Sequence, residues 1–287
     1  MPELVIAVFL FLFGLCVGSF LNVCIYRIPA GKSIVWPASH CPRCEQAIVW
    51  YDNIPLLSFV WLWARCRHCK GRISLQYPVV DLLTGLVMAG YYLAYFDWQV
   101  HDGRLAYWPV YVVHMGLMCT LIVTSVIDFE RKEIYPAITN WGMGLAILLS
   151  FLFPIVQTMP LGWLGGEGFW GSRFDAVLTS VLGLVVGGGV TWLVRILGRL
   201  AFKREAMGFG DVLLMGLIGA VVGWKAAILV FFLAPFFGII YGVVAMIRGK
   251  GREVPYGPFL SMAAAVIILA QGVAGEYFGH QFGPLGQ

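Results

Sequence analysis

Two short stretches decide how this chain is built: SVIDFE at residues 125–130 and MGFGDV at residues 207–212. Each places an aspartate, Asp128 or Asp211, where a long apolar run meets a charged segment. A carboxylate at the edge of hydrocarbon costs free energy unless it is paired or used in function. We therefore interpret Asp128 and Asp211 as partners that helices bring together from distant parts of the chain.

Two carboxyls within a few Å of each other cannot both ionise easily, so they share a proton and can activate a water molecule. That chemistry is typical of aspartic peptidases, and it predicts that both aspartates are catalytic. Gly208 and Gly210 precede Asp211, and glycine allows close approaches that other residues prevent. We expect these two glycines to leave room for a substrate backbone.

Glu130 and Glu133 follow Asp128 in the same short charged segment. The favoured interpretation is a solvated face that Arg131 and Lys132 balance. A secondary role remains open, because an acidic rim beside the aspartates would attract a basic substrate segment, and salt would weaken that attraction.

The composition predicts an all-α polytopic membrane protein. Of 287 residues, 60% are hydrophobic and 12% are charged, whereas soluble domains carry about 25% charged residues. A net charge of +4 says little about nucleic acid, and we expect no nucleic-acid partner. Runs of about 20 apolar residues, enough to cross a bilayer, predict about eight helices, at residues 4–28, 77–96, 108–128, 134–156, 175–199, 211–223, 225–247 and 257–279.

The first run is expected to stay as a helix, because no small-residue cleavage site follows it. The segment 212–234 is the least secure, so seven spans are the alternative. Placing residues 29–76 in the cytosol leaves every Lys and Arg inside except Arg104, Arg173 and Lys225. That asymmetry satisfies the positive-inside rule and puts both aspartates at the cytosolic edge.

Residues 29–76 form the only loop long enough to fold as a small domain. A domain of this size usually needs a disulfide or a bound metal to be stable. Two CxxC pairs supply four thiols, from Cys41, Cys44, Cys66 and Cys69. In a reducing compartment this pattern favours a metal over disulfides. Closed tetrahedral thiolate coordination predicts structural zinc, with His40 and His68 as alternative ligands. The predicted division is a first helix at 1–28, a zinc domain at 29–76 and a peptidase domain at 77–287.

Small residues recur in the run at 175–199. Their spacing is typical of close contact between membrane helices. We expect such contacts at Gly183, Gly187, Gly188 and Gly189.

The chain resembles the type IV prepilin leader peptidases, membrane aspartic peptidases of the GxGD type. The resemblance extends over nearly the whole chain. The matching motifs are GSFLNVCIYRIP at 18–29, CPRC at 41–44, WYDNIP at 50–55, RCRHC at 65–69, IS at 73–74, YP at 77–78, ID at 127–128, GFGD at 208–211 and PYGPFL at 255–260.

The resemblance implies cleavage of type IV prepilins and pseudopilins at the cytosolic face of the bacterial inner membrane, after a short basic leader. It assigns Asp128 and Asp211 to catalysis. Members with the large cysteine loop usually also methylate the new N-terminal amine with S-adenosylmethionine. The implied candidates for methyl transfer are Asp81, Asn22, Arg27 and Asp52.

Three positions depart from the family pattern. Asp81 stands where Glu is frequent, so the carboxylate is kept but is one methylene shorter. Gln76 replaces a common Arg, and Leu213 replaces a frequent Lys two positions after Asp211.

Two other classes of function compete with a peptidase. An ion or proton-coupled transporter with a cytosolic zinc module could use the same carboxylates, but it would need them near the middle of the membrane. A non-enzymatic scaffold would explain the cysteines and leave Gly208 and Gly210 unexplained.

Overall fold

The structure is a computed structural model that describes residues 2–96, 108–157, 169–203, 207–247 and 255–281. Apart from two isolated backbone bridges, these residues are helical or irregular, so the all-α prediction is confirmed. The chain divides into two compact units, residues 1–101 and 102–287.

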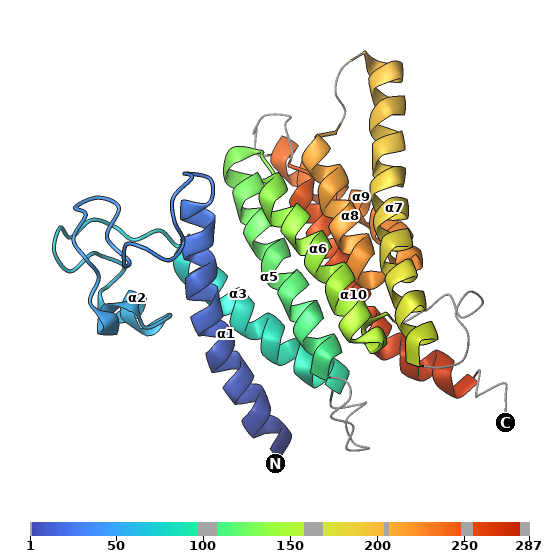
Figure 1. Ribbon diagram of the computed structural model, residues 1–287. Coiled ribbons are helices and arrows are strands. Elements are labelled where there is room, and N and C mark those ends of the chain that lie inside the picture. Colours follow the sequence, from blue (N-terminus) through green and yellow to red (C-terminus); the bar gives the residue numbers. More distant parts are fainter. Residues whose placement is uncertain (1, 97–107, 158–168, 204–206, 248–254, 282–287) are drawn as a thin grey trace. The chain divides into compact units, whose positions relative to one another are not determined.

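The first unit contains a pair of long helices and the cysteine-rich loop between them (Figure 1). Its elements are α1 (Pro2–Arg27), η1 (Trp50–Asn53), α2 (Leu57–Trp61), α3 (Gln76–Tyr91) and η2 (Tyr92–Phe96). Two glycines let α1 lie directly on α3. A Cβ at Gly14 would stand 2.7 Å from the Cα of Gly85, and one at Gly18 would stand 2.6 Å from the Cα of Asp81.

The second unit is a helical bundle built around one short helix, α8 (Figure 1). Its elements are α5 (Trp108–Arg131), α6 (Pro136–Leu152), η5 (Pro154–Val156), α7 (Phe169–Phe202), α8 (Phe209–Val222), α9 (Trp224–Ile247) and α10 (Gly257–Gln281). Helix α8 contacts α5, α6, α7, α9 and α10. From Asp211 to Val222 all but one of its side chains are accordingly buried, and those of Leu214, Met215 and Ile218 have no exposed surface.

The close contact between α7 and α8 depends on two of the four glycines expected to make it. A Cβ at Gly183 would collide with the backbone of Gly219, and one at Gly187 would stand 2.5 Å from the carbonyl oxygen of Met215. At Gly188 the nearest atom would be at an ordinary 3.5 Å, and Gly189 faces open space. The expectation is therefore confirmed for Gly183 and Gly187 and wrong for Gly189, which lies on another face of the helix.

Each of the eight apolar runs contains a helix in the described residues. Five of these helices, α1, α3, α5, α7 and α9, contain stretches long and apolar enough to cross a membrane. Helices α6 and α8 are shorter, with 17 and 14 residues, and α10 is apolar over Gly257–Ala270. The chain is thus a multi-pass membrane protein. The segment 212–234 holds two helices, because Gly223 takes a positive φ of 81° and turns the chain between α8 and α9. The run expected at 134–156 ends as a helix at Leu152, just before Pro154.

Candidate active site and cysteine cluster

The two aspartates lie at helix ends in the second unit, as the sequence predicts. Asp128 is in the last turn of α5, and Asp211 is in the first turn of α8. Both are buried, with 6% and 7% of their surface exposed. Their carboxyls are close enough for the charge of Asp128 to act on Asp211. Residues 83 positions apart in sequence therefore form one acidic pair.

A glycine amide holds one oxygen of each carboxyl. The N–H of Gly257 donates to Oδ2 of Asp128 at 3.0 Å, and the N–H of Gly208 donates to Oδ2 of Asp211 at 3.2 Å. Among the described residues no hydrogen bond is formed by either Oδ1. This arrangement fixes both carboxyls and leaves one oxygen on each for a water molecule or a substrate.

The two glycines of the GFGD motif have different surroundings. Gly208 is the N-cap of α8, and a Cβ there would meet only Oδ2 of Asp211, at 3.5 Å, and the nitrogen of Gly210, at 3.9 Å. A Cβ at Gly210 would stand 2.6 Å from the Cβ of Ile134. The space that a Cβ at Gly210 would take is thus occupied by Ile134 of the same chain, and room for a substrate at these two glycines stays a prediction.

The segment that leads into Asp211 is anchored by a cation from α7. The guanidinium of Arg195 donates to the carbonyl oxygen of Met207 at 3.1 Å and lies 5.6 Å from the ring centre of Phe209. No sequence pattern indicates this contact, because Arg195 lies in a separate apolar run.

Tyr256 also lies near the pair. Burial and the nearby charge of Asp211 raise the pKa of its phenol to about 12. The phenol therefore stays protonated at neutral pH and can donate a hydrogen bond.

Glu130 and Glu133 are exposed in the segment after Asp128, as the solvated interpretation requires. Glu133 accepts a hydrogen bond from the hydroxyl of Tyr135 at 3.2 Å. The structure thus places two exposed carboxylates, with Arg131 and Lys132 between them, in the segment that follows Asp128.

The four cysteines of the first unit converge on one point. The Sγ atoms of Cys41, Cys44, Cys66 and Cys69 all lie within 4.8 Å of one another, and none forms a disulfide. A tetrahedral zinc with Zn–S bonds of about 2.3 Å would separate its sulfurs by just under 4 Å, and Sγ of Cys41 is 4.0 Å from Sγ of Cys69. The donor set therefore fits a structural metal, and the predicted cluster is confirmed.

Each CxxC pair forms the same turn. In the first, the N–H of Cys41 donates to the carbonyl of Gln46 at 2.9 Å, and in the second the N–H of Cys66 donates to that of Gly71 at 2.8 Å. The residue after each pair, Glu45 or Lys70, takes a positive φ of 58° or 57°. The two turns thus present their thiols in the same manner, and His40 and His68 lie outside the cluster.

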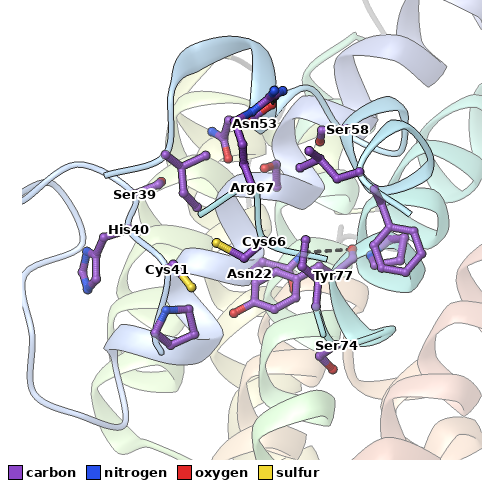
Figure 2. A pocket seen from close by; sticks show the side chains of 18 of the residues that line it. Asn22, Ser39, His40, Cys41, Asn53, Ser58, Cys66, Arg67, Ser74 and Tyr77 are labelled. Carbon is purple, nitrogen blue, oxygen red and sulfur yellow. Dashed lines mark hydrogen bonds and ion pairs between the residues drawn. The ribbon is translucent and has the colours of Figure 1, made fainter. Parts of the chain in front are cut away.

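Beside this cluster lies a cavity of about 440 Å³ within the first unit. Figure 2 shows residues from α1, α3 and the loop around it, among them Asn22, Cys66 and Tyr77. All four residues expected to take part in methyl transfer contribute to its lining. They are Asn22, Arg27, Asp52 and Asp81.

The four lining residues have different environments. The amide of Asn22 donates to Oδ1 of Asp81 at 2.9 Å and to the carbonyl of Tyr77 at 3.1 Å, whereas its own Oδ1 is buried without a partner among the described residues. Arg27 donates to the carbonyl oxygens of Ser33, Pro37 and Ala38. These bonds hold the loop against α1.

Asp52 is paired with a guanidinium. Arg67 donates to both of its oxygens at 2.6 Å, and this bidentate bond lowers the pKa of the Asp52 carboxyl. Asp52 is therefore held by a cation. Asp81 instead lies beside Asn22, whose Oδ1 is buried and has no partner among the described residues.

Comparison with known proteins agrees with both parts of the structure. Residues 12–95 match the bacterial peptidase A24 N-terminal domain, and residues 115–243 match the type IV leader peptidase family. The chain belongs to the type IV leader peptidase family. Both aspartates of the acidic pair lie within the second match, and the cysteine cluster lies within the first.

Several relatives are similar over most of this chain. A prepilin leader peptidase/N-methyltransferase from Myxococcus xanthus is 38% identical over 249 residues, which is 87% of this chain and 65% of that protein. A type 4 prepilin-like proteins leader peptide-processing enzyme from Escherichia coli is 33% identical, over 91% of this chain and 92% of that protein. A prepilin leader peptidase/N-methyltransferase from Pseudomonas aeruginosa is 31% identical, over 90% and 88%. No solved structure matches the chain.

Proposed function

We propose that this protein removes the leader peptide from type IV prepilins and pseudopilins, with Asp128 and Asp211 as the catalytic pair. The observation that carries the proposal is the meeting of two buried carboxyls at the ends of α5 and α8. The family membership and the names of the relatives support the same substrates. The site of action is the cytosolic face of the bacterial inner membrane.

The two carboxyls perform general acid–base catalysis. With one proton between them, the ionised carboxyl takes a proton from a bound water, and the protonated one donates to the carbonyl oxygen of the scissile bond. The water oxygen then bonds to the carbonyl carbon, and the C–N bond breaks as the departing nitrogen takes a proton. The glycine amides keep each Oδ2 in place during these transfers, so that each Oδ1 can reach the water or the substrate.

Selection of the substrate uses the two exposed carboxylates next to the pair. Glu130 and Glu133 are exposed, and a basic leader is attracted to them before it reaches the buried site. Such steering raises the association rate and weakens at high salt.

We propose methyl transfer as the second activity and place it in the cavity of the first unit. The cavity volume, about 440 Å³, falls in the usual range for small-molecule sites. The unpartnered Oδ1 of Asn22 can accept a hydrogen bond from a ligand, and the carboxyl of Asp81 can attract a positive charge. These residues fit S-adenosylmethionine, whose sulfonium supplies an electrophilic methyl group.

Asn22 and Asp81 would hold the ligand or the accepting amine, and an amine must be unprotonated to accept a methyl group. Asp81 is a suitable acceptor for that proton because it is buried and faces the cavity. The four cysteines would hold zinc as a structural ion, since a closed set of four thiolates leaves no open position for catalysis.

The test is incubation of the detergent-purified protein with a membrane-anchored prepilin. We expect loss of the leader, and we expect Asp128→Asn and Asp211→Asn proteins to retain the fold and lose cleavage by at least about 10³-fold, as the loss of an essential acid or base requires. Asp175→Asn, which alters another buried carboxyl of the second unit, is the matched control. An intact prepilin with the unaltered protein would favour the transporter or scaffold alternatives.

Mass spectrometry of the mature pilin tests the second activity. A gain of one methyl group at the new N-terminus, only when S-adenosylmethionine is present, is the expected result. Cleavage with no such gain would reject methyl transfer and leave the peptidase assignment intact.

A further inference from the structure

The start of α10 reaches the acidic pair. Its first residue, Gly257, is buried, and its N–H donates to Oδ2 of Asp128 at 3.0 Å. The first amides of a helix have no partner within that helix. In α10 one of these amides is therefore satisfied by a carboxyl of the pair.

Position 257 needs glycine because neighbouring atoms leave no room for a Cβ, and not because of its backbone conformation. Its φ is not positive, so other residues could adopt its backbone angles. A Cβ there would stand 2.7 Å from Oδ2 of Asp128 and 3.2 Å from Cδ1 of Ile134. Any side chain at position 257 would therefore displace the carboxyl, the isoleucine or the start of the helix.

Ile134 links this contact to the second aspartate. The same side chain lies against Gly210, where a Cβ would be 2.6 Å from the Cβ of Ile134. Gly210 is the neighbour of Asp211 at the start of α8. The side chain of Ile134 thus lies between the start of α8 and the start of α10 and keeps the two helix ends apart.

The residue before Gly257 adds a third contact. Tyr256 accepts hydrogen bonds at its carbonyl from the amides of Phe259 and Leu260 at 3.0 and 3.2 Å, which begin the helix. Its phenol is close enough to Asp211 to experience the charge of that carboxyl. The segment PYGP at 255–258 therefore approaches both aspartates.

We propose that Gly257 is a positioning residue of the peptidase and that Ile134 is its spacer. The Gly257 amide orients the carboxyl of Asp128, and the absence of a side chain lets the start of α10 close against it. Ile134 keeps Asp211 at the distance that proton transfer needs. This inference rests on the proposed peptidase function, and it adds the groups that align the pair.

The test compares Gly257→Ala with Gly242→Ala, whose added Cβ meets nothing within 4 Å. We expect Gly257→Ala to lower kcat by about 10²-fold, the effect of displacing a catalytic group by about 1 Å, with little change in KM or thermal midpoint. Gly242→Ala keeps the kcat of the unaltered protein. A Gly257→Ala protein with unaltered kcat would overturn the proposal.

A second substitution shows whether the spacing set by Ile134 contributes to the effect. Ile134→Val removes the Cδ1 atom that crowds position 257, so it should restore part of the kcat lost in Gly257→Ala. Ile134→Ala alone should lower kcat at constant KM, and this variant decides the matter if Gly257→Ala does not fold. An unaltered kcat in Ile134→Ala, or no recovery in the double variant, would contradict the proposal.

The two proposals fail in different ways. If the unaltered protein does not cleave a prepilin, the peptidase function is wrong. If it cleaves and Asp211→Asn does not, while Gly257→Ala matches the unaltered protein, only the positioning role is wrong.

Discussion

The backbone amide of Gly257 donates to the carboxyl of Asp128, 129 residues earlier in the chain, at 3.0 Å. A hydrogen bond over this separation joins the start of α10 to the end of α5. It makes the acidic pair depend on three helices and not only on the two that carry its aspartates.

Exchange of Glu130 and Glu133 for glutamine should lower kcat/KM for a prepilin with a basic leader and leave kcat almost unchanged. Both side chains are exposed, so they act on the encounter with substrate and not on the bond-breaking step. Steady-state kinetics at low and high salt would measure this. The difference between the variant and the unaltered protein should shrink as salt screens the charges. A difference that is independent of salt would contradict electrostatic attraction.

Cys66→Ser should remove the bound metal and disorder the loop between α1 and α3. One thiol of the four would be lost, and the loop has little apolar core to replace the metal. Metal content by mass spectrometry and loop protection by hydrogen exchange would measure both effects. Cys16→Ser is the matched control, because Cys16 is exposed on α1 outside the cluster. Unchanged metal content in Cys66→Ser would refute the four-thiol site.

Asp81→Asn should lower methyl transfer by about 10²-fold or more, the usual contribution of a general base, and leave leader cleavage intact. Its carboxyl faces the cavity beside the unpartnered oxygen of Asn22. Asp52→Asn is the comparison, because that carboxyl is engaged by Arg67 and should have a smaller effect. Measurement of both products in one reaction would separate the activities. Equal loss of cleavage and methylation in Asp81→Asn would indicate a folding defect in place of a catalytic role.

Gly183→Ala should destabilise the bundle, whereas Gly189→Ala on the same helix should not. The added Cβ at Gly183 would overlap the backbone of Gly219 in α8, and the one at Gly189 would face open space. Where the added Cβ meets no other atom, replacing a glycine inside a helix by alanine stabilises the helix by roughly 0.5–1 kcal/mol. Thermal unfolding in detergent should therefore give a lower midpoint for the first variant and an equal or higher one for the second. The reverse order would show that α7 and α8 do not pack in this way.

The sequence predicted the elements that depend on local pattern. Apolar runs identified every helix that the structure describes in the membrane part, and the spacing of the CxxC pairs predicted the cluster of Cys41, Cys44, Cys66 and Cys69. The convergence of Asp128 and Asp211 followed from the cost of leaving a carboxylate at the edge of hydrocarbon. Each of these inferences uses a property of the residues themselves.

The contacts around the aspartates could not be predicted in the same way. The sequence cannot tell whether a glycine serves a turn, a substrate or a neighbouring side chain, and Gly210 proved to accommodate Ile134. One sequence feature did mark Gly257: it is followed by a proline at the start of an apolar run, and proline is common in the first turn of a helix. Its hydrogen bond to Asp128 is a tertiary contact that no local pattern specifies.

The length of α8 has a consequence for the substrate. Its 14 residues cover about 21 Å at 1.5 Å per residue, whereas the oily interior of a bilayer is about 30 Å thick. At least one end of α8 therefore stops short of the lipid headgroups. Where that end is the one that carries Asp211, an extended peptide has to enter below the membrane surface, and the water that attacks it has to enter as well, so that hydration of this region becomes part of turnover.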